Sequence, residues 1–187
     1  MTMSARTSRP KVAAPSFRGF TPASEASSYA KRHNPSTNTK PEVILCRALF
    51  ERGLRYRKNV GAVAGKPDIV FSRARVAIFC DGDFWHGRDW THLKRQLEHR
   101  ANAAYWIPKI AANRARDVQT RRALRRVGWL VIRVWETDVR ENPRNIAAAI
   151  NKAIAQRLRL PRPRGSPTAA PKMLPSAKRT EMSSGSV

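Results

Sequence analysis

The sequence contains little cysteine, few acidic residues and no long apolar segment. Only two cysteines, Cys46 and Cys80, occur among its 187 residues. They lack the spacing of a metal-binding or redox pair, which argues against a disulfide framework and favours a reducing compartment. No apolar run approaches the roughly 20 residues needed to cross a bilayer. We therefore expect no membrane association and a cytoplasmic location.

The shortage of acids leaves a large positive charge. Lys and Arg number 37 against 13 Asp and Glu, which gives a formal net charge of +24. Residues 39–156 alone carry 24 basic and 11 acidic residues, so the excess is not confined to the ends. Such a charge favours a polyanionic partner. Nucleic acid is favoured over a membrane surface, because no amphipathic helix with a wide apolar face accompanies the charge.

Composition divides the chain into three parts. Residues 1–36 and 161–187 are rich in Ser, Thr, Pro, Ala and Arg and have no apolar periodicity, so we expect disordered basic tails. These tails are either solvated ends without a role or loose tethers to DNA. Residues 37–160 carry apolar periodicity and are expected to form the single folded domain.

Local signals predict the elements of this domain. A capping box formed by Thr39 and Glu42, with Pro41 in the first turn, starts a helix that closes at Gly53. Alternating and apolar segments predict strands, and proline and glycine mark the ends of helices. The remaining elements are a strand over 54–60, a hairpin over 68–80 with its turn at 72–75, a helical region over 90–127 interrupted near Pro108, a strand over 129–136 and a helix over 142–158. This order indicates an α/β fold, a mixed sheet flanked by helices.

Two acids lie at the ends of neighbouring predicted strands. Asp68 opens one strand of the hairpin, and Asp81 follows the other. Such a pair can converge on a hard cation such as magnesium, which prefers oxygen ligands. Aspartate is also a common turn residue, so the pair alone does not distinguish a metal site from a hairpin.

The segment after Asp81 adds a histidine and two large rings. His86 is expected on a loop, where an imidazole with a pKa near working pH can take a proton from water. Phe84 and Trp85 are adjacent, and adjacent side chains of an extended segment point to opposite faces. At least one ring is therefore a candidate for stacking on bases or wedging between them. The alternative is that both rings pack under the following helix.

Five blocks together resemble a known family. In chain order they read "TKPE", "GKPDIVF", "VAIFCDGDFWHG", "YWIPKIAANRARD" and "GWLVIRVWE". Their order and spacing resemble those of the very short patch repair (Vsr) endonucleases over roughly residues 31–142. The resemblance implies a restriction-endonuclease-like fold and a magnesium-dependent nick in double-stranded DNA. The nick would lie on the 5′ side of the thymine in a T:G mismatch.

The resemblance also assigns roles to residues. Asp68 matches the metal-binding aspartate, and Cys80 matches a position whose backbone carbonyl faces the metal. His86 matches the general base, and Glu42 matches a glutamate at the edge of the site. The aromatic wedge that enters the duplex beside the mismatch corresponds to Phe84, Trp85 and Trp106.

The chain departs from the family pattern in two places. Asp81 stands where well-studied members have a second histidine, and a carboxylate there can bind magnesium. Asp83, Arg88 and Thr137 stand where members have ligands of a structural zinc. Only His92 and His99 follow nearby, so a four-ligand zinc site cannot be assembled locally and we expect no structural zinc. Packing by the segment 87–106, with Trp90 and Leu93, is expected to replace the metal.

Basic residues on the long predicted helix have two interpretations. The group just after Trp106 resembles the DNA-facing surface of the family and consists of Asn113, Arg114 and Arg116. A second group is either a DNA contact or, the interpretation we favour, the solvated side of an amphipathic helix whose apolar side is Val118, Leu124 and Val127; it consists of Arg121, Arg122, Arg125 and Arg126. Trp129 and Trp135 share one face of a strand and are expected in the core.

Three functions follow from these residues. The first is a monomeric, magnesium-dependent DNA mismatch endonuclease, in which Asp68 and Asp81 hold the cation and His86 takes the proton. The second is a DNA endonuclease of other specificity, serving restriction or defence. The third is a DNA-binding module with an inactive site.

Overall fold

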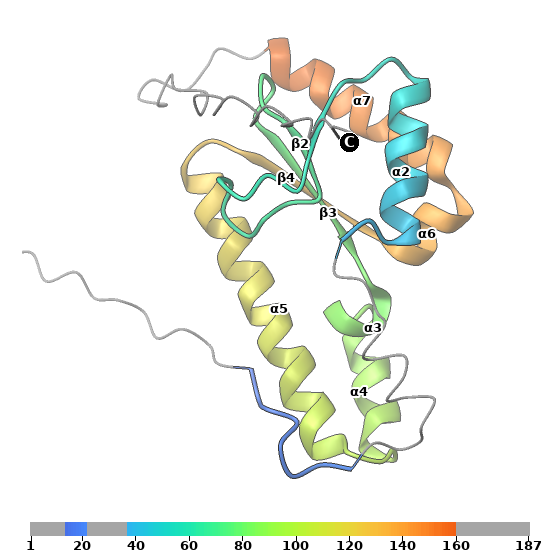
Figure 1. Ribbon diagram of the computed structural model, residues 1–187, viewed down its shortest axis with the longest axis vertical. Coiled ribbons are helices and arrows are strands. Elements are labelled where there is room, and N and C mark those ends of the chain that lie inside the picture. Colours follow the sequence, from blue (N-terminus) through green and yellow to red (C-terminus); the bar gives the residue numbers. More distant parts are fainter. Residues whose placement is uncertain (1–13, 22–36, 160–187) are drawn as a thin grey trace, which may run out of the picture.

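The computed structural model describes residues 14–21 and 37–159 of the 187-residue chain (Figure 1). Predictions for residues 1–13, 22–36 and 160–187 lie outside the described residues. Residues 14–21 were expected to belong to a disordered tail, but they pack against the folded domain. Among the described helices, none has the length and apolar character needed to cross a membrane.

Helix α2 (Lys40–Glu51) begins with a modified form of the predicted capping box. The carboxylate of Glu42 accepts from the Thr39 hydroxyl at 2.8 Å and from the backbone amide of Asn38 at 2.8 Å. In the standard box Glu42 would accept from the amide of Thr39 itself, and the Thr39 hydroxyl would accept from the amide of Glu42. Here the glutamate turns toward the preceding residue, so both of its oxygens are engaged at the helix start.

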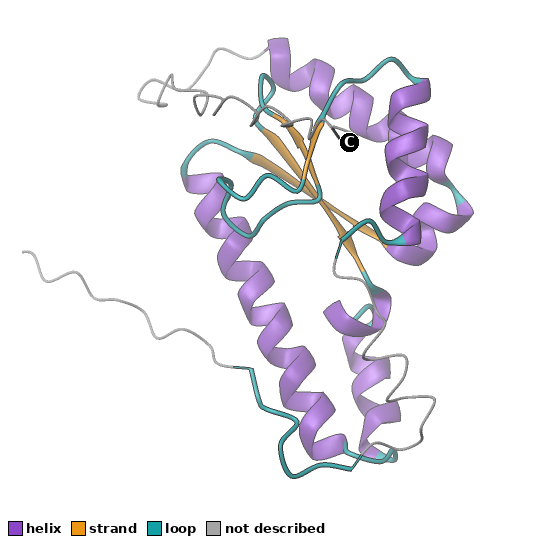
Figure 2. Ribbon diagram, viewed as in Figure 1, coloured by secondary structure: helices purple, strands orange, loops and turns teal. Residues whose placement is uncertain are grey.

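Four strands form one mixed sheet in the order β1-β2-β3-β4 (Figure 2). They are β1 (Arg57–Lys58), β2 (Ile69–Phe71), β3 (Val76–Asp81) and β4 (Leu130–Trp135). The pairs β1-β2 and β2-β3 are antiparallel, and β3-β4 is parallel. The predicted mixed sheet flanked by helices is confirmed. Strand β1 is much shorter than predicted, because both its residues are exposed at the sheet edge and Asn59 then turns into a left-handed conformation (φ 49°).

The connection between the parallel strands β3 and β4 is helical. It comprises α3 (Asp83–His86), α4 (Trp90–Glu98) and α5 (Ala103–Arg126). The predicted interruption at Pro108 is wrong, since α5 runs through it. Proline removes only one intrahelical hydrogen bond, and it sits near the helix start. The break comes earlier, where Asn102 adopts a left-handed conformation (φ 63°) between α4 and α5.

Both faces of the sheet are covered by helices, as Figure 1 shows. The larger core lies between the sheet and helices α2, α6 (Glu136–Glu141) and α7 (Pro143–Arg159). Its fully buried side chains include Leu45, Leu49, Ile69, Ile78 and Val139. A smaller cluster beneath α5 contains Ala77, Phe79, Leu124 and Val131.

The predicted faces of α5 and β4 are correct only in part. Leu124 is buried as expected, but Val127 is 56% exposed and does not join an apolar helix face. Trp129 packs against the smaller cluster, as predicted, whereas Trp135 is only partly buried at the end of β4. The three arginines Arg122, Arg125 and Arg126 are exposed.

Candidate active site

The carboxyl end of β3 opens into a pocket of about 850 Å³. The start of β2, the start of α2, helix α3 and the middle of α5 also contribute to its wall. The structure brings most of the predicted site residues to this pocket, namely Glu42, Asp68, Cys80, Asp81, Trp85, His86 and Arg116. Seven further polar residues to which sequence reasoning gave no role also line it: Lys40, Lys66, Asp117, Thr120, Arg133, Glu136 and Arg140.

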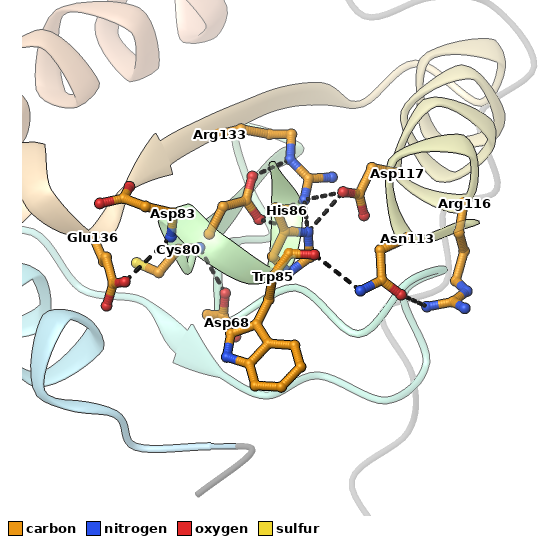
Figure 3. Close-up of polar contacts among 11 residues, drawn as sticks. Asp68, Cys80, Asp83, Trp85, His86, Asn113, Arg116, Asp117, Arg133 and Glu136 are labelled. Carbon is orange, nitrogen blue, oxygen red and sulfur yellow. Dashed lines mark hydrogen bonds and ion pairs between the residues drawn. The ribbon is translucent and has the colours of Figure 1, made fainter. Parts of the chain in front are cut away.

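Asp68 lies directly before β2 and faces the end of β3. Its Oδ2 accepts from the backbone amide of Cys80 at 2.7 Å (Figure 3). Burial raises the pKa of Asp68 to about 6, and the nearby carboxylates of Glu42 and Asp81 add to the rise. Burial and the neighbouring negative charges disfavour the ionised form of Asp68, so a cation placed beside it would stabilise that form.

Cys80 contacts Asp68 through its backbone and not through its thiol. Its amide is bound to Asp68, and burial raises the pKa of the thiol far above its usual range. The thiol is therefore protonated and weakly nucleophilic at neutral pH. The expected role of the Cys80 backbone carbonyl at a metal stays a prediction.

Asp81 forms a buried ion pair. It is the last residue of β3 and only 3% exposed, and both its oxygens accept from the guanidinium of Arg133 on β4. Asp81 pairs in register with Trp135, two residues beyond Arg133, so the two side chains project from neighbouring strands. The expected metal-binding role of Asp81 thus competes with an arginine that already occupies both oxygens.

His86 is held by a second carboxylate. Its Nδ1 lies 2.7 Å from Oδ2 of Asp117 on α5 (Figure 3). The same nitrogen lies 3.7 Å from Oδ1 of Asp81. A neutral imidazole bonded in this way carries its proton on Nδ1, which leaves Nε2 as the basic nitrogen. The guanidinium of Arg133 lies 3.2 Å from Asp117 and therefore links the two carboxylates that face His86.

His86 and Arg133 stabilise the negative charge of Asp117. Burial acts to raise the pKa of Asp117, but the hydrogen bond from His86 and the guanidinium of Arg133 hold it below its ordinary value. Asp117 is therefore ionised at neutral pH and can orient the imidazole. Sequence reasoning missed it, although it ends the "NRARD" motif, where an acid follows a cluster of basic residues.

Helix α3 places His86 and the two rings differently from the expected loop. Gly82 precedes the helix, and Gly87 ends it in a left-handed conformation (φ 66°). A Cβ at Gly87 would lie 2.9 Å from Ile110, so the close approach to α5 also requires glycine. Because the segment is helical and not extended, Phe84 and Trp85 lie on the same side as Trp106.

These three rings form one cluster. Their centroids are 5.3 Å apart for Phe84 and Trp85, 5.4 Å for Phe84 and Trp106, and 5.6 Å for Trp85 and Trp106. All three are partly exposed, and Trp85 reaches the pocket. The structure thus brings the predicted wedge residues together beside His86.

The residues expected at zinc-ligand positions lie together and bind one another. The Thr137 hydroxyl donates to Asp83, and Arg88 lies 3.5 Å from Asp83 and 2.6 Å from Asp138. The backbone amide of Asp83 donates to Glu136 at 3.2 Å. Helix α3 is therefore fixed to α6 by hydrogen bonds and ion pairs. Stabilisation by packing of the segment 87–106 stays a prediction; within that segment the guanidinium of Arg114 covers the ring of Trp90.

Two of the expected DNA-facing residues on α5 are engaged within the protein. Asn113 is only 8% exposed and donates to the carbonyl of Trp85 at 2.9 Å, and Arg114 donates to the carbonyl of Gly87 at 2.9 Å. Arg116 bonds Asn113 at 3.2 Å and lines the pocket. Asn113 and Arg114 therefore hold the segment after β3 in place, and DNA contact by them stays a prediction.

Comparison with known proteins places the chain in a family. A family model described as DNA mismatch endonuclease Vsr matches residues 20–92. The type II nicking enzyme V.NmeDIP of Neisseria meningitidis serogroup C is 44% identical over 121 residues, covering 65% of this chain and 80% of that protein. The type II nicking enzyme V.HpaIIP of Haemophilus parainfluenzae is 42% identical over 127 residues, covering 68% and 89%.

A more distant relative carries the family name itself. The DNA mismatch endonuclease Vsr of Escherichia coli is 32% identical over 103 residues, covering 55% of this chain and 64% of that protein. The resemblance found in the five sequence blocks is thereby confirmed. With its mixed sheet, the chain has a restriction-endonuclease-like fold, and it belongs to the Vsr family of DNA endonucleases, which are hydrolases.

Proposed function

We propose that the protein is a magnesium-dependent endonuclease that nicks double-stranded DNA on the 5′ side of the thymine in a T:G mismatch. The observation that carries this proposal is the His86–Asp117 pair, placed in one pocket with Asp68 and Trp85. This reaction needs a general base, a carboxylate that can bind a cation and an aromatic ring that can enter the duplex, and His86, Asp68 and Trp85 can supply them. The name of the Escherichia coli relative supports mismatched DNA as the substrate.

The pocket offers a fitting place for magnesium at Asp68. Burial and the two neighbouring carboxylates raise the pKa of Asp68, and a divalent cation would offset that repulsion. Asp68 and the backbone carbonyl of Cys80 would hold the metal, with waters completing the shell. Among the described residues, no three His, Cys, Asp or Glu side chains are arranged as a metal site. The protein would therefore supply few of the oxygen ligands, and waters the rest.

Asp81 would join this set only if Arg133 moved away. Both oxygens of Asp81 accept from Arg133, so a role of Asp81 as a magnesium ligand requires this ion pair to open. Bound magnesium would supply Lewis-acid stabilisation of the charge that develops on the phosphate. We keep the absence of a structural zinc and a monomeric state as predictions.

His86 performs the proton transfer in this scheme. Its Nε2 takes a proton from the water whose oxygen forms the new bond to phosphorus, while one P–O bond of the backbone breaks. The leaving oxygen takes a proton from solvent. Asp117 keeps the imidazole in the required tautomer and stabilises the imidazolium that forms. Glu42 acts from the edge of the site, through its effect on the charge of Asp68.

Basic side chains around the pocket would bind the DNA backbone. Besides Arg133, which is paired with Asp81 and Asp117, four Lys and Arg residues line the pocket: Lys40, Lys66, Arg116 and Arg140. Contacts between cationic side chains and phosphates weaken steeply with salt, because binding releases counterions. The cluster of Phe84, Trp85 and Trp106 would enter the stack beside the mismatch and separate the bases.

A second candidate function is a nick at another DNA sequence. The relatives with the longest matching segments, V.HpaIIP and V.NmeDIP, are named type II nicking enzymes, and that name specifies no mismatch. An inactive DNA-binding module is disfavoured, because a binder has no need for a His86–Asp117 pair beside a buried aspartate.

Strand-specific nicking tests the proposal. Duplexes that differ only in one T:G mismatch or a matched C:G pair are incubated with magnesium, with His86→Ala as the control. Nicking of the mismatched duplex alone, 5′ of the thymine, is the expected result. Equal cutting of both duplexes would favour the second function, and tight binding without any cutting would leave the inactive module.

A further inference from the structure

A short N-terminal arm, residues 14–21, lies against the start of α5 (Figure 1). The ring of Phe17 meets the ring of Tyr105 edge-on with centroids 4.7 Å apart, and Phe20 lies 5.5 Å from the same ring. The side-chain amide of Asn102 donates to the carbonyl of Thr21 at 2.7 Å. The arm is thus held to α5 and to the residue before it by Phe17, Phe20 and Thr21.

The sequence "FRGF" within the arm is a turn that requires glycine. The amide of Phe20 donates to the carbonyl of Phe17 at 3.1 Å, and Gly19 adopts φ +90° at the third position. A four-residue turn with a positive φ at this position strongly favours glycine. The turn brings Phe17 and Phe20 onto Tyr105 together and leaves Arg18 exposed at its corner.

The arm continues the aromatic cluster beside the pocket. The ring of Phe17 lies 6.2 Å from that of Trp106, which in turn lies 5.4 Å from Phe84 and 5.6 Å from Trp85. Trp106 therefore contacts rings from both the arm and α3. Tyr105 beneath them is only 4% exposed, whereas the five rings above it are partly exposed: Phe17, Phe20, Phe84, Trp85 and Trp106.

Partial exposure of five contiguous rings is characteristic of a contact surface. A core would bury them, and an exposed apolar patch on a soluble chain marks a binding site. The chain carries a net charge of +24, and Arg18 lies within the patch, so the partner suited to this surface is a polyanion with flat apolar faces. Unstacked nucleobases on a phosphate backbone have both properties. The family match begins only at residue 20, so Phe17 and Arg18 precede it.

We propose that Phe17 and Phe20 form a second, N-terminal part of the DNA-opening surface. Phe17 helps to hold Trp106 in place together with the rings of α3, and the joined rings accept unstacked bases of the opened duplex. Arg18 pairs with the adjacent backbone phosphate. This inference rests on the proposed function, since it concerns how the same nicking site gains access to its DNA.

The test measures duplex opening and nicking separately. A duplex with a T:G mismatch carries 2-aminopurine in the neighbouring pair, and its fluorescence rises when the base is unstacked. Opening is recorded in the His86→Ala background, where the strand stays intact, and single-turnover nicking is recorded with His86 present. The variants are Phe17→Ala with Phe20→Ala, the same positions changed to Tyr, and Phe50→Ala. Phe50 is a matched control because it is 58% exposed on α2, outside the arm and the pocket.

The double alanine variant should lose about tenfold in both opening and nicking rate, as expected for the loss of one base-stacking contact. The tyrosine variant, which keeps both rings, and Phe50→Ala should retain wild-type values. Equal opening and nicking in the double alanine variant and Phe50→Ala would overturn the inference.

A second measurement needs no variant of the arm. Wild-type protein is irradiated with a duplex carrying 5-iodouracil beside the mismatch, and the crosslinked peptide is identified by mass spectrometry. A crosslink within residues 14–21 supports the arm as a DNA contact, and crosslinks confined to residues 83–116 contradict it. If the wild-type protein neither nicks nor binds this duplex, the proposed function itself fails, which is a different result.

Discussion

The imidazole Nδ1 of His86 lies 2.7 Å from the carboxylate of Asp117, a residue 31 positions later in the chain. The first comes from the short helix after β3 and the second from the middle of α5. Because the Asp117 carboxylate is ionised and faces Nδ1, it selects the tautomer in which Nε2 is basic. The base of the proposed reaction is therefore a pair of residues and not a lone histidine.

Replacing Asp117 by Asn should impair nicking while leaving DNA binding largely intact. The amide can present its oxygen or its nitrogen to Nδ1, and it no longer stabilises the imidazolium. We expect the single-turnover rate to fall by about 100-fold or more, the range of a positioned general base. His86→Ala is the matched control, and binding is measured by fluorescence anisotropy. Wild-type nicking by Asp117→Asn would remove the pair from the mechanism.

Asp68 gives a prediction about pH and stability. Its folded pKa of about 6 lies above the ordinary value of 3.8, so the unfolded chain releases this proton first. Ionisation of Asp68 therefore destabilises the fold progressively as pH rises from about 4 to about 6. Asp68→Asn should abolish nicking yet increase the free energy of unfolding at pH 7, without metal, by roughly 1–2 kcal/mol.

The pH dependence supplies the control for this prediction. At pH 4.5 wild-type Asp68 is already protonated, so the gain from Asn should largely disappear. Urea unfolding at both pH values in the presence of a chelator measures the difference. An Asn variant that is less stable at pH 7 would show that the negative charge of Asp68 is stabilising, against the burial argument.

Sequence reasoning found the residues that stand close together in the chain. Asp68, Asp81, His86 and the two adjacent rings flank two predicted strands, and strand ends bring such residues to one edge of a sheet. Asp117 was missed because its contact with His86 depends on how α5 lies across the sheet. Arg133 was missed because it occupies the polar position of an alternating strand, where a solvent-facing side chain is the usual outcome.

Local composition also misled the prediction at two places, the N-terminal arm and Pro108. The arm around Phe17 and Phe20 is surrounded by Ser, Pro and Arg, which are typical of tails, and only its contact with Tyr105 reveals its packing. At Pro108 the proline rule predicted a break, but α5 continues through this residue, which costs only one hydrogen bond near the helix start. Helix boundaries, the order of strands in the sheet and long-range pairs thus needed the structure, whereas the mixed sheet flanked by helices and the edge that carries the site could be predicted.

The pairing of Asp81 with Arg133 predicts that removing either charge alone is costly. Asp81→Asn leaves the guanidinium with only Asp117 as a charged partner in a buried site. Breaking a buried ion pair in this way typically costs about 3–5 kcal/mol, and Asp117 should reduce the cost here. Urea unfolding measures the loss. The double variant Asp81→Asn, Arg133→Gln should lose less free energy of unfolding than the sum of the losses in the two single variants.

The Asp81→Asn variant also tests whether Asp81 binds magnesium. If Asp81 is only the partner of Arg133, the magnesium concentration for half-maximal nicking should be similar in Asp81→Asn and wild type. If Asp81 is a ligand, that concentration should rise more than tenfold while stability changes little. Titration of nicking with magnesium, on protein checked for folding by circular dichroism, separates the two outcomes.

The contacts among Asp83, Arg88, Thr137 and Asp138 predict a protein whose folding needs no zinc. These side chains bind one another where the family resemblance implies zinc ligands, and they fix α3 to α6. Incubation with a strong chelator should leave the thermal midpoint unchanged, and atomic emission spectroscopy should detect no stoichiometric zinc. Arg88→Ala should lower stability and slow nicking, because Asp83 and Asp138 lose the cation that joins α3 to α6, and α3 carries His86. Arg88→Lys, which keeps the charge without the planar fork, should restore part of both; a chelator-sensitive midpoint in wild type would contradict the prediction.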